Sequence, residues 1–357
     1  MGFEAPPQPW LTADQLAAHP PKPRAWHVHG LIPAGTVTLL GGDGGTGKSL
    51  VALQLAIATA TGRDWIGQPV TSGRAIFTSA EDDLDEIHRR ISDITRAENI
   101  APAELERLTL RSLAGRDALL ALVQKNGGLT ATPLFHELDQ RMSDESPALL
   151  VLDTLADLFP GNENDRAQAR QFIGMLRGLA IRHDCAVLLL AHPSLSGLNS
   201  GSGTSGSTAW NNSVRSRLYL NRVRDGEHEP DPDARTLTTK KSNYDRAGRE
   251  IALRWKNGVF VAQADETGLD QRAAAARAER VFLKLLDEFT AQGRTVKSAN
   301  AAGYAPKAFA LSGRAEGMTK QQLHEAMERL FTKGEIVEEL GGGGPPSKHT
   351  KRIMRAR

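Results

Sequence analysis

The chain has 357 residues and a formal net charge of +2, with 44 Lys and Arg against 42 Asp and Glu. A length of this size is expected to hold one large and one small domain, and no stretch approaches the roughly 18 consecutive apolar residues of a membrane span. The N-terminus lacks the basic and apolar regions of a signal peptide. The single cysteine, Cys185, has no partner within the chain. We therefore expect a cytoplasmic protein that makes no membrane contact and contains no disulfide.

The first 30 residues are rich in proline and have little periodicity. We expect residues 1–30 to form an arm that packs on the core or on a neighbouring subunit. From residue 31 to residue 262, apolar strand-like runs alternate with helical segments, which is typical of a parallel sheet covered by helices. The predicted strands are Thr36–Leu40, Arg74–Ser79, Leu108–Ser112, Ala148–Asp153, Ala186–His192, Ser216–Arg222, Ala234–Lys241 and Ile251–Lys256. The last three are expected to form an antiparallel extension.

The most informative segment fits the phosphate-binding pattern G-x-x-x-x-G-K-[ST] at every fixed position; it reads Gly42-Asp43-Gly44-Gly45-Thr46-Gly47-Lys48-Ser49. An apolar strand precedes it and a helical run follows it. Glycines let backbone N–H groups converge on phosphates, and the helix N-terminus adds positive potential. Lys48 is expected to reach the β- and γ-phosphates, and the Ser49 hydroxyl to bind Mg²⁺. The sequence therefore predicts ATP and Mg²⁺ as ligands.

The strand that follows the P-loop helix ends in a run of acidic residues, Glu81-Asp82-Asp83. In one class of P-loop proteins, a Glu at this position orients and deprotonates the attacking water. The alternative is a carboxylate that caps the next helix, for which Asp82 or Asp83 would serve equally well. We favour Glu81 as the catalytic base.

Two further strands end in polar residues. The run 148–153 is apolar and ends in Asp153, as does a Walker B strand whose Asp holds Mg²⁺ through water. No Glu follows Asp153, which supports a base elsewhere, at Glu81. The run 187–192 ends in His192, where a sensor of the γ-phosphate would lie; the alternative is a purely structural histidine.

Cations follow late in the domain, at Arg215, Arg217 and Lys241. Such groups can reach a neighbouring subunit's γ-phosphate, although composition alone favours ordinary surface charges. The Ser/Gly-rich residues 194–208 have the composition of a flexible linker. Because they lie between core-like strands, we expect a mobile loop within the domain, and a hinge near residues 262–271.

The C-terminal piece, residues 272–357, carries its own helical patterns. A first helix places Ala278, Val281, Phe282, Leu285, Leu286 and Phe289 on one stripe. A second begins with a capping box from Thr319 to Gln322 and stops at Gly334. Two strands, 336–340 and 350–354, follow around a Gly-Pro tip at 341–346. We expect a winged-helix-like domain. After Leu340 come five basic residues and no acidic ones, which either track DNA phosphates or keep the protein soluble.

Together these residues resemble the RepA-type hexameric replicative helicases of plasmids and, more broadly, the RecA-like AAA-type ATPases of phages and mobile elements. The likeness covers roughly residues 25–257. It rests on the P-loop, Ser79-Ala80-Glu81-Asp82, Ile87-His88-Arg89-Arg90, Val151-Leu152-Asp153-Thr154-Leu155, Leu190-Ala191-His192 and Lys241-Ser242-Asn243-Tyr244. The resemblance implies a RecA-like P-loop core, with the small winged-helix-like domain outside it.

The resemblance also implies a homo-oligomeric, hexameric ring with ATP at subunit interfaces. Glu81 would be the base and His192 the sensor, while Arg215 would be an arginine finger supplied in trans with help from Lys241; Arg217 is the rival finger. The loop after His192 would face a central channel and contact single-stranded DNA. Two departures stand out: the family's second His is Pro193 here, and residues 194–208 contain no Lys or Arg.

We therefore expect an ATP-dependent DNA motor, a replicative helicase of a mobile element. One alternative is a recombination or strand-annealing ATPase. Another is an ATP-gated regulator whose C-terminal domain contacts duplex DNA through the helix of residues 319–333.

Overall fold

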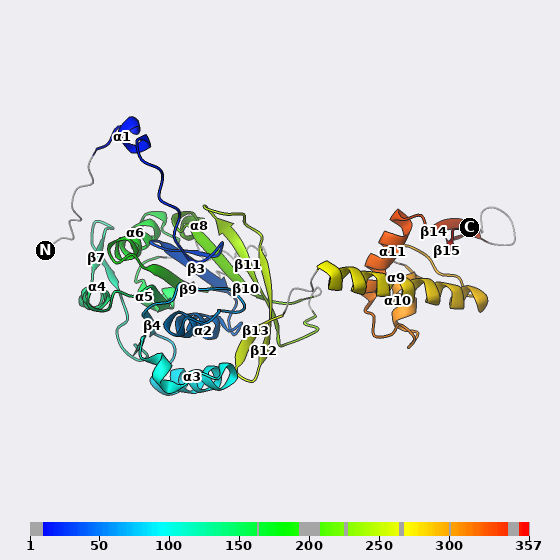
Figure 1. Ribbon diagram of the computed structural model, residues 1–357, viewed down its shortest axis with the longest axis horizontal. Coiled ribbons are helices and arrows are strands. Elements are labelled where there is room, and N and C mark those ends of the chain that lie inside the picture. The colour runs from blue at the N-terminus through cyan, green and yellow to red at the C-terminus, as the bar shows by residue number, and fades with distance from the viewer. Residues whose placement is uncertain are drawn as a thin grey trace. The chain divides into compact units, whose positions relative to one another are not determined.

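The computed structural model describes residues 10–162, 164–192, 208–224, 228–263, 268–299, 301–341 and 350–356. Contacts divide the chain into two units, Met1–Gln263 and Ala264–Arg357 (Figure 1). The boundary between them falls within residues 262–271. Among the described residues, no helix combines the length and the apolar character that crossing a membrane requires.

The N-terminal unit is built on a nine-stranded sheet of order β13-β12-β11-β10-β3-β9-β8-β4-β5. Six strands are parallel: β3 (Val37–Gly42), β4 (Ala75–Ser79), β5 (Leu108–Ser112), β8 (Leu149–Asp153), β9 (Ala186–Ala191) and β10 (Ser216–Arg222). Three more extend the sheet in antiparallel fashion: β11 (Ala234–Ser242), β12 (Glu250–Lys256) and β13 (Val259–Ala262). The predicted α/β class with a mostly parallel sheet covered by helices is confirmed.

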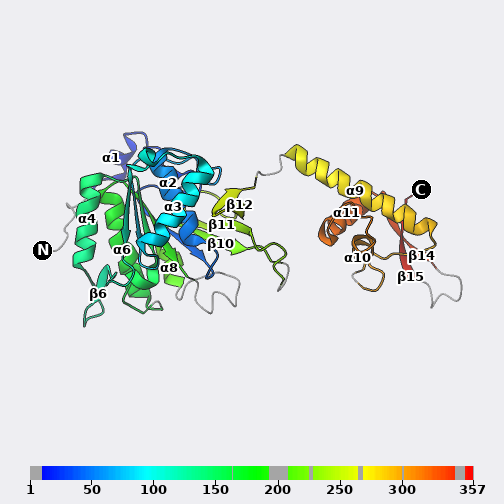
Figure 2. The same cartoon turned by 90° about the horizontal axis from the view of Figure 1, so that it is seen from below.

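Helices cover both faces of this sheet. On one face lie α2 (Lys48–Thr61) and α3 (Leu84–Glu98); on the other lie α4 (Pro133–Glu145), α5 (Leu155–Leu158), α6 (Arg166–Arg182) and α8 (Thr208–Ser213) (Figure 1). In Figure 2 the layer of α2 and α3 comes to the front. Along β9, Leu188 and Leu190 pack into the first layer, and Val187 and Leu189 into the second. Because both faces are covered, the central strand β9 is continuously apolar, and β8 is apolar up to Asp153.

Short elements decorate this core. A hairpin of β6 (Ala121–Val123) and β7 (Leu129–Ala131) follows β5, and a 3₁₀ turn spans Pro102–Leu105. Near the N-terminus, β1 (Trp26–Val28) pairs with β2 (Ile32–Pro33). The sequence analysis predicts none of these strands, because two or three residues carry too little alternation to be recognised.

Within the described part of the N-terminal arm, β1 packs on the core, where Val28 is fully buried. The short helix α1 (Ala13–Ala17) buries none of its side chains, and Trp10 is fully exposed. Residues 10–23 are exposed, whereas the Arg24 guanidinium lies 3.6 Å from the centre of the Tyr244 ring, so the expected packing of the arm on the core is seen from Arg24 onward. The sequence shows that the arm contains large side chains, but it does not show which surface those side chains contact.

His27 ties β1 to the P-loop helix. Its Nε2 lies 2.9 Å from the Thr59 hydroxyl, which itself donates to the Leu55 carbonyl at 2.8 Å. Since the hydroxyl proton is already used, the imidazole Nε2–H is the donor to Thr59. Burial lowers the pKa of His27 to about 4, because a charged imidazolium would lose its hydration there.

This buried histidine predicts a loss of stability in mild acid. The folded pKa lies below the ordinary value near 6.5, so the stabilisation is present above pH 6.5 and is lost as the pH falls toward 4. The full loss is about 3 kcal/mol in the free energy of unfolding. Urea denaturation at pH 7 and pH 4 measures it, with His27→Gln as the control that removes this part of the pH dependence. Equal pH dependence in the two proteins would contradict the assignment.

The C-terminal unit contains α9 (Gly268–Ala291), α10 (Ala305–Ala310) and α11 (Lys320–Thr332), followed by the antiparallel pair β14 (Ile336–Gly341) and β15 (Thr350–Arg355). The six residues of the predicted stripe are all buried in its core. The capping box at Thr319 is present, and Gly334 has a left-handed φ of 69° after the end of α11. The Ile353 amide donates to the Val296 carbonyl at 2.9 Å, which attaches the hairpin to the segment after α9. Residues 342–349, with most of the predicted tip, lie outside the described residues.

Candidate nucleotide-binding site

The P-loop, residues 42–49, connects β3 to α2 and depends on glycine at two points. Gly47 is the N-cap of α2 with a left-handed φ of 95°, and a Cβ there would lie 2.5 Å from a ring carbon of Phe260. A Cβ at Gly42 would lie 2.7 Å from the carbonyl oxygen of Leu220. Any other residue would push these neighbours away from the loop.

The open side of the loop offers donors to an anion. The N–H groups of Lys48 and Ser49 lie in the first turn of α2, where no acceptor within the helix is available to them. The Thr46 hydroxyl instead donates to the Asp43 carbonyl at 2.9 Å, so Thr46 shapes the loop. A Cβ at Gly44 would meet no described atom within 4 Å. The loop therefore presents backbone donors on a face that is free of side chains.

Lys48 lies across the mouth of the P-loop. Its Nζ donates to the Gly42 and Asp43 carbonyls at 2.8 and 3.1 Å, and lies 3.3 Å from Nδ1 of His192. Burial lowers the pKa of Lys48, while the charges of Glu81, Asp153 and Asp43 act in the opposite direction. A desolvated ammonium beside carboxylates is suited to stabilise added phosphate charge.

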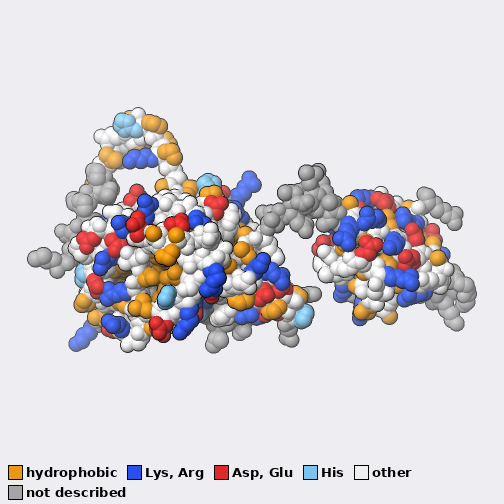
Figure 3. Space-filling view, turned by 60° about the horizontal axis from the view of Figure 1, so that its bottom comes forward, with side chains coloured by type: hydrophobic (Ala, Val, Ile, Leu, Met, Phe, Trp, Pro, Cys, Tyr) orange, Lys and Arg blue, Asp and Glu red, His pale blue; other side chains and the backbone are white. Residues whose placement is uncertain are grey.

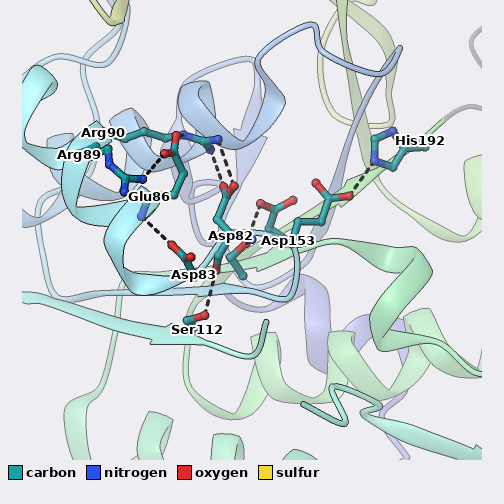
Figure 4. A network of polar contacts seen from close by, with 10 residues as sticks. Asp82, Asp83, Glu86, Arg89, Arg90, Ser112, Asp153 and His192 are labelled. Carbon is teal, nitrogen blue, oxygen red and sulfur yellow. Dashed lines mark hydrogen bonds and ion pairs between the residues drawn. The ribbon is translucent and has the colours of Figure 1, made fainter. Parts of the chain in front are cut away.

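The three acidic residues after β4 have separate environments. Asp83 is the N-cap of α3 and accepts from the Glu86 amide at 2.8 Å. Asp82 pairs with Arg90 at 2.5 Å, and Figure 4 shows its carboxylate turned toward Arg90 and away from His192. Glu81 is half-exposed and lies 3.1 Å from Nε2 of His192. The capping role that competed with the catalytic one is thus taken by Asp83, and Glu81 faces the P-loop.

Asp153 ends β8 at the same edge of the sheet. Its side chain is 1% exposed, and Ser79 donates to its Oδ2 at 3.3 Å. Burial raises the pKa of Asp153 to about 6, although hydrogen bonds from Ser49 and Ser79 lower it. The link to Ser49 joins the two residues that the sequence proposed as Mg²⁺ ligands. Their oxygens, side by side against Lys48, are the donor types that Mg²⁺ prefers.

The P-loop, the carboxylates of Glu81 and Asp82, and His192 line one cleft of about 440 Å³. One end holds Lys48, Ser49, Glu81 and His192, all of which the sequence predicted as functional. The other end is walled by residues that sequence reasoning missed: Pro232, Asp233, Arg235, Trp255 and Phe260. The cleft therefore extends from the P-loop to the antiparallel extension of the sheet, whose wall carries both apolar and charged side chains.

Arginines from distant strands support the loop. Arg222 donates to the Gly45 carbonyl at 3.1 Å, and Arg235 donates to the Thr46 carbonyl at 3.2 Å. The Tyr219 hydroxyl donates to the Asp43 carboxylate at 2.7 Å. No signal in the sequence finds these residues, because they lie more than 170 positions from the loop in the chain.

Arg215 and Lys241 lie near the amino-terminal ends of the parallel strands, whereas the P-loop lies at the carboxyl ends. Since β10 runs parallel to β3, with Ser216 beside Thr38 and Leu220 beside Gly42, the start of β10 is far from its own P-loop. Lys241 donates to the carbonyls that end α8, at Asn211 (2.7 Å), Asn212 (3.4 Å) and Val214 (2.9 Å). Burial lowers the pKa of Lys241, and the charge of Arg215 adds to the effect. The structure brings these two cations together, but not to the cleft of the same chain.

Arg217, the rival of Arg215, is 4% exposed in the middle of the sheet. Its guanidinium lies 5.6 Å from the centre of the Tyr219 ring, and burial lowers its pKa. A side chain enclosed in this way is less able to reach another subunit than Arg215, which is only partly buried.

The structure describes only parts of the two segments that are expected to contact DNA. Residues 193–207 of the loop after His192 lie outside the described residues, as do Lys348 and Arg357 of the basic tail. The three described tail cations form ion pairs within the C-terminal unit: Lys351–Glu338 (3.1 Å), Arg352–Glu339 (3.8 Å) and Arg355–Asp287 (2.8 Å). On the visible face of that unit, positive and negative side chains are interspersed (Figure 3).

The chain is similar to known proteins over part of its length. The DNA repair protein RadA of Synechocystis sp. is 24% identical over 179 residues, which are 48% of this chain and 31% of RadA; the chain thus spans about a third of this curated relative. The crystal structure of the RadB recombinase covers 65% of this chain and 92% of its own, with 16% identity and a TM-score of 0.46. A family model described as an AAA domain matches residues 3–197, more than half of the chain. The chain therefore belongs to the AAA domain family.

Proposed function

We propose that this chain is an Mg²⁺-dependent ATP hydrolase whose active site is completed by a second copy, and that it drives DNA unwinding as a ring-forming replicative helicase. The observation that supports this proposal most strongly is that the predicted catalytic residues lie in two separate places on the subunit. Lys48, Ser49 and Glu81 share one cleft, with Asp153 bonded to Ser49 beneath it, while Arg215 and Lys241 lie near the amino-terminal ends of the parallel strands, far from that cleft. In a ring, the cleft of one subunit would face the Arg215 and Lys241 of its neighbour, and the two sets of residues would together form one active site.

In the proposed reaction, the P-loop amides and Lys48 hold the ATP phosphates. Glu81 accepts a proton from a water molecule, whose oxygen attacks the γ-phosphorus in line. The bond from that phosphorus to the β–γ bridging oxygen breaks, and ADP and phosphate leave. Ser49 and Asp153 would hold Mg²⁺, which would supply positive charge to the phosphate oxygens.

His192 is placed to report on the nucleotide. Its ring bridges Glu81 on one side and Lys48 on the other. Charge added at the γ-phosphate would draw Lys48 away from its loop carbonyls and so change both contacts of the ring. At the far end of the cleft, Trp255 offers a partly exposed aromatic face to the nucleobase.

The DNA part of the proposal has indirect support. One relative is named a DNA repair protein, and the sequence resembles ring helicases at the base, the sensor and the Lys-x-Asn-Tyr segment. For the C-terminal unit, we propose duplex contact through the first turn of α11, where Lys320 and Gln321 are exposed.

Charge neutralisation of Lys351 and Arg352 tests the tail. Each side chain already pairs with a Glu of β14, so few counterions would be released at these positions. We expect the double variant Lys351→Gln/Arg352→Gln to change the slope of log K against log salt by less than about 1, where two free phosphate contacts would change it by about 1.8. Fluorescence anisotropy with a duplex between 50 and 200 mM salt measures the slope. Lys320→Gln is the comparison, with an expected change of about 0.9.

Deleting the tail would be a poorer test. Ile353 is 2% exposed in the core of the C-terminal unit, and its amide bonds to Val296. Removing β15 would therefore damage the fold as well as the charge.

The whole proposal is tested by measuring ATP turnover and fork unwinding, with and without single-stranded DNA, for the wild type and Lys48→Ala. A helicase shows DNA-stimulated turnover and unwinding, and both are lost in the variant. Turnover without unwinding, together with strand annealing, would instead establish a recombination-type ATPase. Sequence-specific footprints that need ATP and survive Glu81→Gln would establish a regulator, as the order of α9, α10, α11 and the β14–β15 hairpin favours.

A further inference from the structure

A second polar cavity, of about 340 Å³, lies between α6 and α8. Three arginines line it: Arg170 and Arg177 from α6, and Arg215 from the start of β10. Seven positions apart on one helix, Arg170 and Arg177 lie two turns from each other on the same side. The cavity is completed by Asn212 and Ser213 at the end of α8, and by Ile173 and Gly174.

The charges of this cavity are not compensated within the described part of the chain. No ion pair among the described residues includes any of the three arginines, whereas Arg222, which supports the P-loop, pairs with Glu229 at 3.1 Å. The Nε atom of Arg215 is buried and has no described hydrogen-bond partner. Lys241 adds a fourth positive charge close to Arg215.

Such a cluster is costly unless an anion joins it. Like charges gathered in a partly desolvated cavity repel one another, and a buried N–H without an acceptor loses the free energy of a hydrogen bond. Guanidinium groups match the oxygen geometry of phosphates. The chain's own P-loop lies at the opposite ends of the parallel strands, so the phosphates of a nucleotide bound there are out of reach of this cavity.

We propose that Arg170 and Arg177 form, with Arg215, a three-arginine socket that receives the terminal phosphate of the ATP bound by a second copy of the chain. This inference rests on the proposed function, and it adds two residues of α6 to the single finger at Arg215. Two of the three arginines lie on the same helix, α6. The spacing between them is therefore fixed within the subunit that supplies the socket.

The test uses complementation between full-length variants. Arg177→Gln keeps its P-loop and loses the socket, while Lys48→Ala keeps its socket and loses the P-loop. We expect Arg177→Gln, and likewise Arg170→Gln, to lower ATP turnover about 10- to 100-fold with the ATP dissociation constant unchanged. Arg166→Gln, which removes an exposed arginine of α6 outside the cavity, should leave turnover unchanged.

Mixing Arg177→Gln with Lys48→Ala should restore turnover, because some interfaces then join an intact P-loop to an intact socket. Normal turnover in both α6 variants, or no recovery on mixing, would overturn the socket. Loss of DNA binding with normal turnover in the absence of DNA would also overturn it, by assigning the cavity to a nucleic-acid backbone. A wild type that binds but never hydrolyses ATP would sink the proposed function, and that result is seen before any variant is made.

Discussion

Replacing Glu81 by Gln is expected to lower the kcat for ATP hydrolysis by about 10²- to 10⁴-fold, while ATP still binds. The amide keeps the size of the side chain and its contact with His192, but it cannot accept the proton of the attacking water. Because Lys48 and the P-loop amides are untouched, the dissociation constant for ATP should change little. Steady-state turnover and nucleotide titration of the same sample separate the two effects.

Asp83→Asn is the matched control, since it makes the same chemical change two residues away. Asp83 caps α3, and Asn caps nearly as well as Asp. We expect normal turnover and nearly normal stability. If Asp83→Asn lost turnover and Glu81→Gln kept it, the two carboxylates would have to exchange roles.

Replacing Arg215 by Ala is expected to lower kcat by about 10³- to 10⁵-fold, as the loss of an arginine finger does. The side chain is only partly buried and has no ion pair among the described residues, so the subunit should stay folded. Turnover in the variant should not rise with protein concentration, because its assembled interfaces remain incomplete.

Arg217→Ala separates the two candidates for the finger. Arg217 is enclosed in β10 beside Tyr219, and we expect its loss to lower the melting temperature. Turnover per folded molecule should fall less than in Arg215→Ala. A well-folded Arg217→Ala with the larger loss of turnover would assign the finger to Arg217.

The core of the fold could be predicted because its strands are buried on both faces. Runs such as 148–153 and 186–191 are continuously apolar and end where the sheet meets the cleft. In a parallel sheet, strands that end together bring their last residues to one edge, so Asp153, Glu81 and His192 could be grouped from sequence alone. The polar residue that ends each apolar run was the informative signal.

Other parts could not be predicted, and the reason is distance along the chain. Arg235 bonds to Thr46 of the P-loop across 189 positions, and Phe260 bonds to Gln54 of α2 across 206 positions. No local pattern in the sequence encodes such a contact. The burial of Arg217 depends on the order of strands in the sheet. The arm of residues 10–25 is a second example, because its tryptophan and leucines do not indicate which surface they contact.

The two hydrogen bonds between the Gln54 side chain and the backbone of Phe260, at 2.9 and 3.0 Å, have a wider consequence. They fasten β13, the last strand of the sheet, to the helix that begins at the P-loop. The sheet order runs from β3, which enters the P-loop, through β10, β11 and β12 to β13. The contact between β13 and α2 therefore links the last of these strands back to the helix that leaves the same loop. The wall of the cleft is therefore preorganised before a nucleotide arrives, and binding should require little ordering of the protein and so little loss of entropy.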